Sequence, residues 1–158
     1  MNTFLGWRMV AFAIAIDFFA VGFAFQTYPV IQLYLEKELN LSRFVTTLTI
    51  PIFMICSAVF FPIVGRLLDK YSVKKIIVWG GFIYSISLIS LYFTINYFTF
   101  ILIYGLPIAL GATLMGNLAT SKLVSSWFEK HAGRALGFAA VGVSFAAVSY
   151  THLTLPTT

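Results

Sequence analysis

The chain has 158 residues, of which 60% are hydrophobic and only 9% are charged, and its formal net charge at pH 7 is +5. A soluble domain has about a quarter of its residues charged, so this composition excludes an ordinary soluble domain and indicates an integral membrane protein. The Lys and Arg residues lie in short clumps between long apolar runs. Their positive balance therefore indicates membrane topology rather than binding to nucleic acid.

Five apolar runs predict an all-α membrane protein with about four and a half transmembrane helices. The expected spans cover residues 7–34, 44–68, 76–95, 97–124 and 135–150. The fifth run has about 16 residues, short of the roughly 20 that cross a bilayer, so we expect this span to be truncated. Residues 151–158 turn polar and contain a proline. We expect them to be a non-native or misread tail; a short re-entrant helix is the alternative.

Asp17 is the acidic residue in the middle of the first span, ten residues and therefore about 15 Å beyond Trp7. A carboxylate at that depth costs at least about 2.5–3.5 kcal/mol, so it should be protonated, paired or in contact with water. The same helical face carries Ala13, Ala20, Ala24 and Tyr28. These mostly small residues predict contact with protein rather than lipid. We interpret Asp17 as a candidate proton-coupling group; a structural carboxyl bonded to a neighbouring helix is the alternative.

The fourth span carries two stripes of residues at helical spacing. The small stripe consists of Gly105, Ala109, Ala112, Gly116 and Ala119. Such a stripe favours close packing of membrane helices. Beside it, Thr113, Asn117 and Thr120 form a polar stripe, and a buried amide in a membrane should face protein or a cavity. Together with Gln26 and Tyr28 of the first span, the polar stripe is the candidate substrate pathway.

A compact block of charge separates the second and third spans: Gly65-Arg66-Leu67-Leu68-Asp69-Lys70-Tyr71-Ser72-Val73-Lys74-Lys75. Gly65 and Asp69 are four residues apart and share a helical face. The glycine therefore lets another backbone come close, and the carboxylate is the polar feature of that contact.

The distribution of cations predicts the orientation of the chain. On one side of the membrane we expect Arg8, Arg66, Lys70, Lys74, Lys75, Lys122, Lys130 and Arg134. The other side receives only Lys37 and Arg43. Because cations concentrate in cytoplasmic segments, this asymmetry predicts a multi-pass protein of the cytoplasmic (inner) membrane with its N-terminus in the cytoplasm.

The charged block resembles the loop motif between the second and third helices of the major facilitator superfamily, usually written G-x-L-x-D-R-x-G-R-[KR]. The residues that match in place are Gly65, Leu67, Asp69 and Lys74. Lys70 stands where the family prefers arginine, and Ser72 and Val73 replace the usual glycine and arginine. The resemblance therefore does not extend to the glycine of the family's tight turn or to one of its arginines.

Two further stretches are similar to one branch of this family, the monocarboxylate and oxalate–formate transporters. Residues 125–137, Ser-Ser-Trp-Phe-Glu-Lys-His-Ala-Gly-Arg-Ala-Leu-Gly, resemble its W-F-x-[KR]-x-x-G-x-A-x-G pattern between the fourth and fifth helices. Gly6-Trp7-Arg8 resembles the start of its first helix. The branch has an arginine near Ala132, where His131 is the nearest substitute. The three matches occur in the family's order and cover residues 6–149.

The resemblance implies the N-terminal part of a twelve-helix secondary transporter, in which two six-helix halves rock around a site at the midplane. It also implies a small anionic substrate, such as a monocarboxylate or dicarboxylate, moved by exchange or proton coupling. The expected conformational-switch loop consists of Gly65, Arg66, Asp69, Lys70 and Lys74. In the family the acid of this loop contacts the other half, so the C-terminal half of the same protein, missing from this chain, is an expected partner, as is the lipid bilayer.

No nucleophile–base set, metal cluster or phosphate-binding loop is recognisable in the sequence, and Cys56 is its lone cysteine. We therefore expect no enzyme activity, no catalytic residue, no metal and no cofactor. A complete small membrane protein that acts as an oligomeric exporter, or as a non-transporting scaffold, is the alternative to the transporter.

Overall fold

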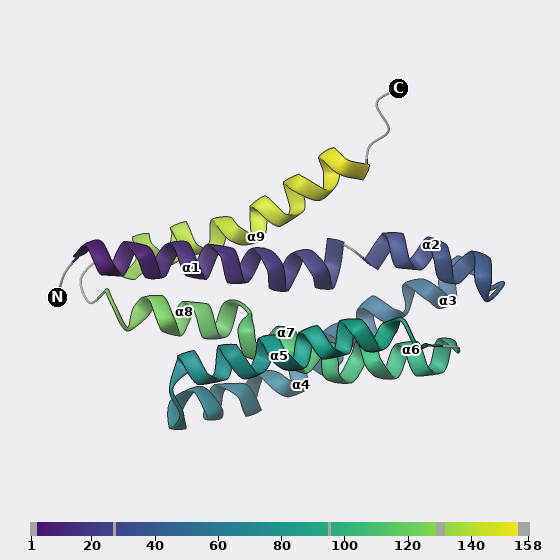
Figure 1. The fold of residues 1–158 in the computed structure, drawn as a ribbon, viewed down its shortest axis with the longest axis horizontal. Helices are drawn as coiled ribbons and strands as arrows, with labels where there is room; N and C mark the ends of the chain where they lie inside the picture. The colour runs from purple at the N-terminus through teal and green to yellow at the C-terminus, as the bar shows by residue number, and fades with distance from the viewer. Residues whose placement is uncertain (1–2, 27, 95, 129–131, 155–158) are drawn as a thin grey trace.

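The computed structural model describes residues 3–26, 28–94, 96–128 and 132–154, and every regular element in these ranges is helical (Figure 1). The elements are α1 (Thr3–Val21), the π-helical turn η1 (Gly22–Gln26), α2 (Tyr28–Glu38), α3 (Arg43–Thr47), α4 (Thr49–Lys70), α5 (Val73–Leu91), α6 (Tyr97–Ile103), the π-helical turn η2 (Tyr104–Ile108), α7 (Ala109–Met115), α8 (Asn117–Ser125) and α9 (Ala132–Thr154). The expected all-α fold is confirmed.

Four continuous stretches of the described chain are long and apolar enough to cross a membrane: Gly6–Glu38, Arg43–Lys70, Val73–Leu91 and Tyr97–Ser125. They coincide with the four complete spans expected from the sequence, and the third begins and ends a few residues earlier than predicted. α9 is a shorter apolar helix between Ala132 and Val148 and continues to Thr154. Residues 155–158 lie outside the described residues, so a non-native tail stays a prediction.

Two irregularities inside the spans fall next to prolines, which lack the N–H that a helix needs. Pro51 lies in the first turn of α4, where its missing N–H has no helical partner, and the second span is interrupted just before it at Leu48. Pro107 lies inside η2, a π-helical turn of the fourth span. Pro62 lies within α4, which continues through it. The prolines thus shape the spans without ending them, as expected where neighbouring helices surround the freed carbonyls.

The fourth span is the centre of the described bundle (Figure 1). Half of its most apolar stretch is buried, compared with less than a third in each of the other spans. α7 packs against α4 and α5, and α8 packs against α1 and α9. α9 also runs beside α1. Two residues of the polar stripe, Thr113 and Thr120, are therefore buried among these helices, whereas Asn117 is exposed.

Small residues bring the central helices close together. A Cβ added at Gly80 of α5 would lie 2.6 Å from the Leu114 side chain, and one added at Gly111 of α7 would lie 2.8 Å from the Tyr84 backbone. A Cβ added at Gly133 or Gly137, near the start of α9, would meet no described atom within 4 Å. The tight contact of α9 lies instead at Gly142, against the backbone of Ile14 in α1.

The two ends of the bundle differ in the connections that they carry. One end holds the start of α1, the α4–α5 connection and the α8–α9 connection, all at the left of Figure 1. The opposite end holds the α2–α3 and α5–α6 connections. The segments that carry most of the cations therefore lie together. That this end faces the cytoplasm stays a prediction.

The orientation can be tested with cysteines placed at the two ends. Ser72 is exposed in the α4–α5 connection and its side chain makes no capping bond, and Lys37 is exposed near the end of α2. Asn40 is a poorer site because its φ of 49° is strained for cysteine. With Cys56 replaced by alanine, we expect Ser72→Cys to react with an impermeant thiol reagent from the cytoplasm and Lys37→Cys from outside. Labelling of both from the same side would contradict the described fold.

The adjacent residues Gly80 and Gly81 provide a matched pair for testing the packing of α5 on α7. A Cβ at Gly81 would meet nothing within 4 Å, unlike one at Gly80. We expect Gly80→Ala to lower the free energy of unfolding by about 1–3 kcal/mol, the usual effect of overpacking. Gly81→Ala should leave it unchanged or raise it by up to about 1 kcal/mol, because alanine favours a helix. Unfolding in mixed micelles, followed by circular dichroism, measures both; equal effects would contradict this packing.

Candidate functional site

Asp17 of α1 is a buried carboxylate that contacts a buried hydroxyl of the fourth span. Its exposed fraction is 1%, and that of Thr120 in α8 is 0%. The Thr120 hydroxyl oxygen lies 3.0 Å and 2.9 Å from the two carboxylate oxygens. Asp17 has no cationic partner among the described residues. The residues that share its face, Ala13, Ala20, Ala24 and Tyr28, are all buried, as expected of a face that contacts protein.

The fourth span is broken at Gly116, one turn before Thr120. Gly116 is extended, with φ −78° and ψ −159°, and it separates α7 from α8. A Cβ at this position would lie 2.5 Å from the Ala112 carbonyl oxygen, so the break needs a glycine for lack of space. The first N–H groups of α8 have no partner within their own helix. Broken helices of this kind line the binding sites of many secondary transporters.

A cavity with a volume of about 310 Å³ lies beside this break. Its walls come from α1, η1, α4, α7 and the start of α8, and they include the rings of Phe25, Phe53 and Phe61. Its polar lining residues are Ser57, Thr113 and Asn117. No charged residue of the described chain lines it. The cavity therefore offers apolar and aromatic surface with a few uncharged hydrogen-bonding groups, a common composition for small-molecule sites.

Ser57 of α4 is a cavity residue that the sequence analysis missed. Its hydroxyl oxygen is buried and has no hydrogen-bond partner among the described residues. A buried unpaired hydroxyl is costly, so a group that reaches this cavity gains a hydrogen bond by meeting it. The available signal was a serine within the apolar second span, in a membrane segment where polar residues are uncommon.

The structure divides the predicted substrate pathway. Thr113 and Asn117 line the cavity, whereas Thr120 contacts Asp17. Tyr28 is fully buried and donates its hydroxyl to the Thr46 carbonyl of α3, so it joins the first two spans away from the cavity. The side chain of Gln26 lies outside the described residues. Thr113 donates to the Ala109 carbonyl at 2.6 Å, which leaves its hydroxyl oxygen free to accept.

In the predicted switch loop, Asp69 forms an ion pair with Lys122 of α8. The exposed fraction of the Asp69 side chain is 79% and that of Lys122 is 38%. A Cβ at Gly65 would meet no described atom within 4 Å, so this face of α4 is open. The other loop residues, Arg66, Lys70 and Lys74, are exposed. The sequence analysis used Lys122 only to predict topology and missed it as a partner of Asp69.

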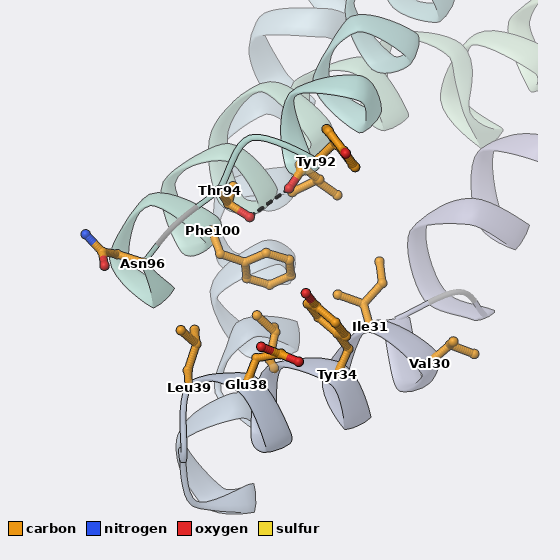
Figure 2. Close-up of a pocket in the computed structure, with 11 residues that line it drawn as sticks. Val30, Ile31, Tyr34, Glu38, Leu39, Tyr92, Thr94, Asn96 and Phe100 are labelled. Atoms are coloured by element: carbon orange, nitrogen blue, oxygen red, sulfur yellow. Dashed lines mark hydrogen bonds between the residues drawn. The ribbon is translucent and has the colours of Figure 1, made fainter.

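A second hollow, of about 560 Å³, lies between α2 and the α5–α6 connection. Figure 2 shows the side chains of Ile31, Tyr34 and Phe100 converging on it. Glu38 is its charged lining residue. None of the residues of the predicted substrate pathway lines this hollow, so it is separate from the cavity beside Gly116.

Comparison with known proteins gives the family. A model described as Major Facilitator Superfamily matches residues 4–151. An uncharacterised MFS-type transporter of Bacillus subtilis, YcxA, is 30% identical over 125 residues, which is 79% of this chain and 29% of that protein. The MFS-type transporter pynF of Aspergillus niger is 27% identical over 152 residues, 93% of this chain and 34% of pynF.

The fujikurins efflux protein of Gibberella fujikuroi is 30% identical over 89 residues, 56% of this chain and 19% of that protein. The chain thus spans about a third or less of the length of these relatives. No solved structure matches it significantly. These relatives are named as transporters and an efflux protein, and the family is not enzymatic, which confirms the expectation that the chain is not an enzyme. The chain belongs to the Major Facilitator Superfamily.

Proposed function

We propose that this chain is the N-terminal part of a secondary transporter that moves a small organic anion by alternating access. The family match and the named transporter relatives support transport. The share of each relative that the chain covers supports a longer protein with a second half. Its spans form part of the first six-helix half, with the N-terminus in the cytoplasm and the protein in the inner membrane.

The observation that carries the proposal is the cavity beside the break in the fourth span. One helical turn after this break, Thr120 contacts the buried carboxylate of Asp17. The cavity is lined by Gly116 of the break, by Thr113 and Asn117 on either side of it, and by Ser57 of α4. Asp17 of α1 accepts a hydrogen bond from Thr120, which follows the break in α8. A substrate site and a protonatable group thus share one irregular segment of backbone. In this arrangement, movement of the break affects both.

The lining of the cavity determines which part of the substrate it can hold. Its aromatic walls fit a carbon skeleton, and its hydroxyl and amide groups fit an uncharged polar substituent. Since no described cation lines it, the carboxylate of an organic anion must find its positive partner elsewhere. We assign that partner to the second half of the transporter. The monocarboxylate or dicarboxylate class follows from the resemblance of residues 6–149 to that branch of the family.

We assign the loop residues Gly65, Arg66, Asp69, Lys70 and Lys74 to the switch between access states. Asp69 is largely exposed although it is paired with Lys122, so it can also contact a helix end of the second half. A carboxylate near a helix N-terminus is worth up to about 2 kcal/mol. That is enough to shift a balanced two-state equilibrium by more than tenfold. Lys122 competes for the same carboxylate and therefore favours the opposite state.

Transport itself is tested by reconstitution of the full-length transporter in lipid vesicles. We expect accumulation of labelled monocarboxylates or dicarboxylates, driven by a proton gradient or by exchange against the same anion. Flux of neutral or cationic compounds alone would contradict the anion assignment. Accumulation by residues 1–158 without any further chain would contradict the two-half transporter and favour a small oligomeric exporter.

Asp17→Asn tests the coupling assignment. Asparagine keeps the shape of the side chain and its contact with Thr120 but cannot exchange a proton, so we expect proton-driven uptake to fall to background. Insertion and folding should be nearly unchanged, because a neutral amide is cheaper to bury than a carboxylate. The measurement is uptake with and without a pH gradient, and Glu38→Gln is the control for loss of an exposed carboxylate. Unchanged coupling in Asp17→Asn would make this carboxyl structural.

Asp69→Asn should lower turnover strongly and change substrate affinity much less, because the loop lies far from the cavity. Lys122→Gln should shift accessibility of the two faces in the opposite direction, by about two- to fivefold, the range expected of an exposed ion pair. Lys70→Ala should act like Asp69→Asn but more weakly, since Lys74 and Lys75 replace its charge. Cysteine labelling from both sides, together with substrate binding, measures these effects. Lost binding with unchanged labelling in Asp69→Asn would contradict a switch.

A further inference from the structure

The hydroxyl of Thr120 has several acceptors within reach but only one hydrogen to donate. Its oxygen lies 3.0 Å and 2.9 Å from the two oxygens of Asp17. It also lies 3.1 Å from the Asn117 carbonyl oxygen and 3.4 Å from the Gly116 carbonyl oxygen. A threonine hydroxyl donates one hydrogen bond and accepts up to two. The hydroxyl must therefore choose between the carboxyl of α1 and the backbone at the break.

The protonation state of Asp17 decides this choice. An ionised carboxylate is acceptor-only, so the hydrogen between the two groups must come from Thr120. A protonated carboxyl can donate its own hydrogen to the Thr120 oxygen. The Thr120 hydroxyl then no longer donates to Asp17, and it can donate its hydrogen to the Asn117 or Gly116 carbonyl oxygen. Every hydrogen is accounted for in both states, and no other group is needed.

The carbonyls that receive this hydrogen belong to the break in the fourth span. The Gly116 carbonyl already accepts from the backbone N–H groups of Ala119 and Thr120, at 3.0 Å and 3.2 Å. A hydroxyl that bonds a carbonyl three or four residues earlier competes with these N–H groups, and it weakens and bends the helix locally. Protonation of Asp17 therefore loosens the first turn of α8. This turn also carries Asn117, which lines the cavity.

We propose that Thr120 is a positioning residue that transmits the protonation state of Asp17 to the helix break at Gly116, and thereby to the cavity. The inference rests on the proposed role of Asp17 in proton coupling and adds the route by which that proton reaches the substrate site. This transmission requires the Thr120 hydroxyl. If Thr120 served only to fill space between the helices, a side chain of the same shape without a hydroxyl would be sufficient.

Among the described side chains, the other charged and titratable groups on the helices around Asp17 are paired, hydrogen-bonded elsewhere or exposed. α8 carries Lys122, which pairs with Asp69, and α9 carries Arg134, which is exposed. Tyr84 of α5 donates its hydroxyl to the Ala20 carbonyl, and Tyr104 of η2 donates to the Ala24 carbonyl. α1 itself carries Arg8, which is exposed. The segments α7 and η1 contribute no charged residue in the described part of the chain.

The test is a double-mutant cycle read by hydrogen–deuterium exchange of the full-length protein in lipid nanodiscs, at one fixed pH. Asp17→Asn mimics the neutral carboxyl, because its amide can donate to Thr120. We expect it to speed exchange of the backbone amides of residues 116–121 by about threefold or more when Thr120 is present. In the Thr120→Val background, which keeps the shape and removes the hydroxyl, Asp17→Asn should have no effect on these amides.

Two variants serve as controls. Thr120→Ser keeps the hydroxyl and should retain the response to Asp17→Asn. Thr113→Val removes a buried hydroxyl of the same span that bonds only its own helix, and should also retain the response. If Thr120→Val does not fold, Thr120→Ala gives the same cycle.

Equal effects of Asp17→Asn with and without the Thr120 hydroxyl would overturn the inference. That outcome differs from failure of the proposed function, which shows as proton-driven uptake that survives Asp17→Asn. The exchange measurement needs no transport, so each idea can fail without the other.

Discussion

The rest of the described structure depends on burying one carboxyl group inside an apolar bundle. A carboxyl at the depth of Asp17 needs a polar partner, and within the described part of the chain Thr120 provides it. To bring the two together, α8 must lie against α1, and small residues on both helices allow that approach. The break at Gly116 then lets α7 take a separate direction toward α4 and α5. The position of the Asp17 carboxyl and the path of the fourth span therefore depend on each other.

Much of the fold could be predicted because membrane segments leave a strong record in sequence. The four complete spans follow from the length of the apolar runs, and the protein-facing side of Asp17 follows from Ala13, Ala20 and Ala24 at helical spacing. The Asp17–Thr120 contact could not be predicted, because periodicity gives the face of a helix but not its height relative to a neighbour. Likewise the close packing of α9 lies at Gly142 and not at Gly133. Both glycines are equally compatible with the sequence pattern.

The predicted pathway residues separated for physical reasons that the sequence does not contain. Thr113, Asn117 and Thr120 are neighbours on an unbroken helix, but the extended backbone at Gly116 alters the relation between the segments on either side. Thr113 and Asn117, on either side of Gly116, line the cavity, and Thr120 contacts the Asp17 carboxyl. A lone glycine in a small-residue stripe indicates close packing in most membrane helices, so its role as a break was not evident. The unpaired hydroxyl of Ser57 is evident only from its surroundings.

The contact of α5 with α7 has a consequence for how the described bundle moves. At Gly80 and Gly111 the two backbones interlock with no space for a methyl group, so sliding or rotation of one helix against the other would cause collisions. The third span and the α7 segment of the fourth therefore form a rigid unit, to which the other segments are attached. Elastic deformation must gather where the α-helical hydrogen-bond pattern is already irregular, at η1, Leu48, η2 and Gly116. These points lie on the first, second and fourth spans, whereas α5 is continuous from Val73 to Leu91, so bending gathers in spans other than the third.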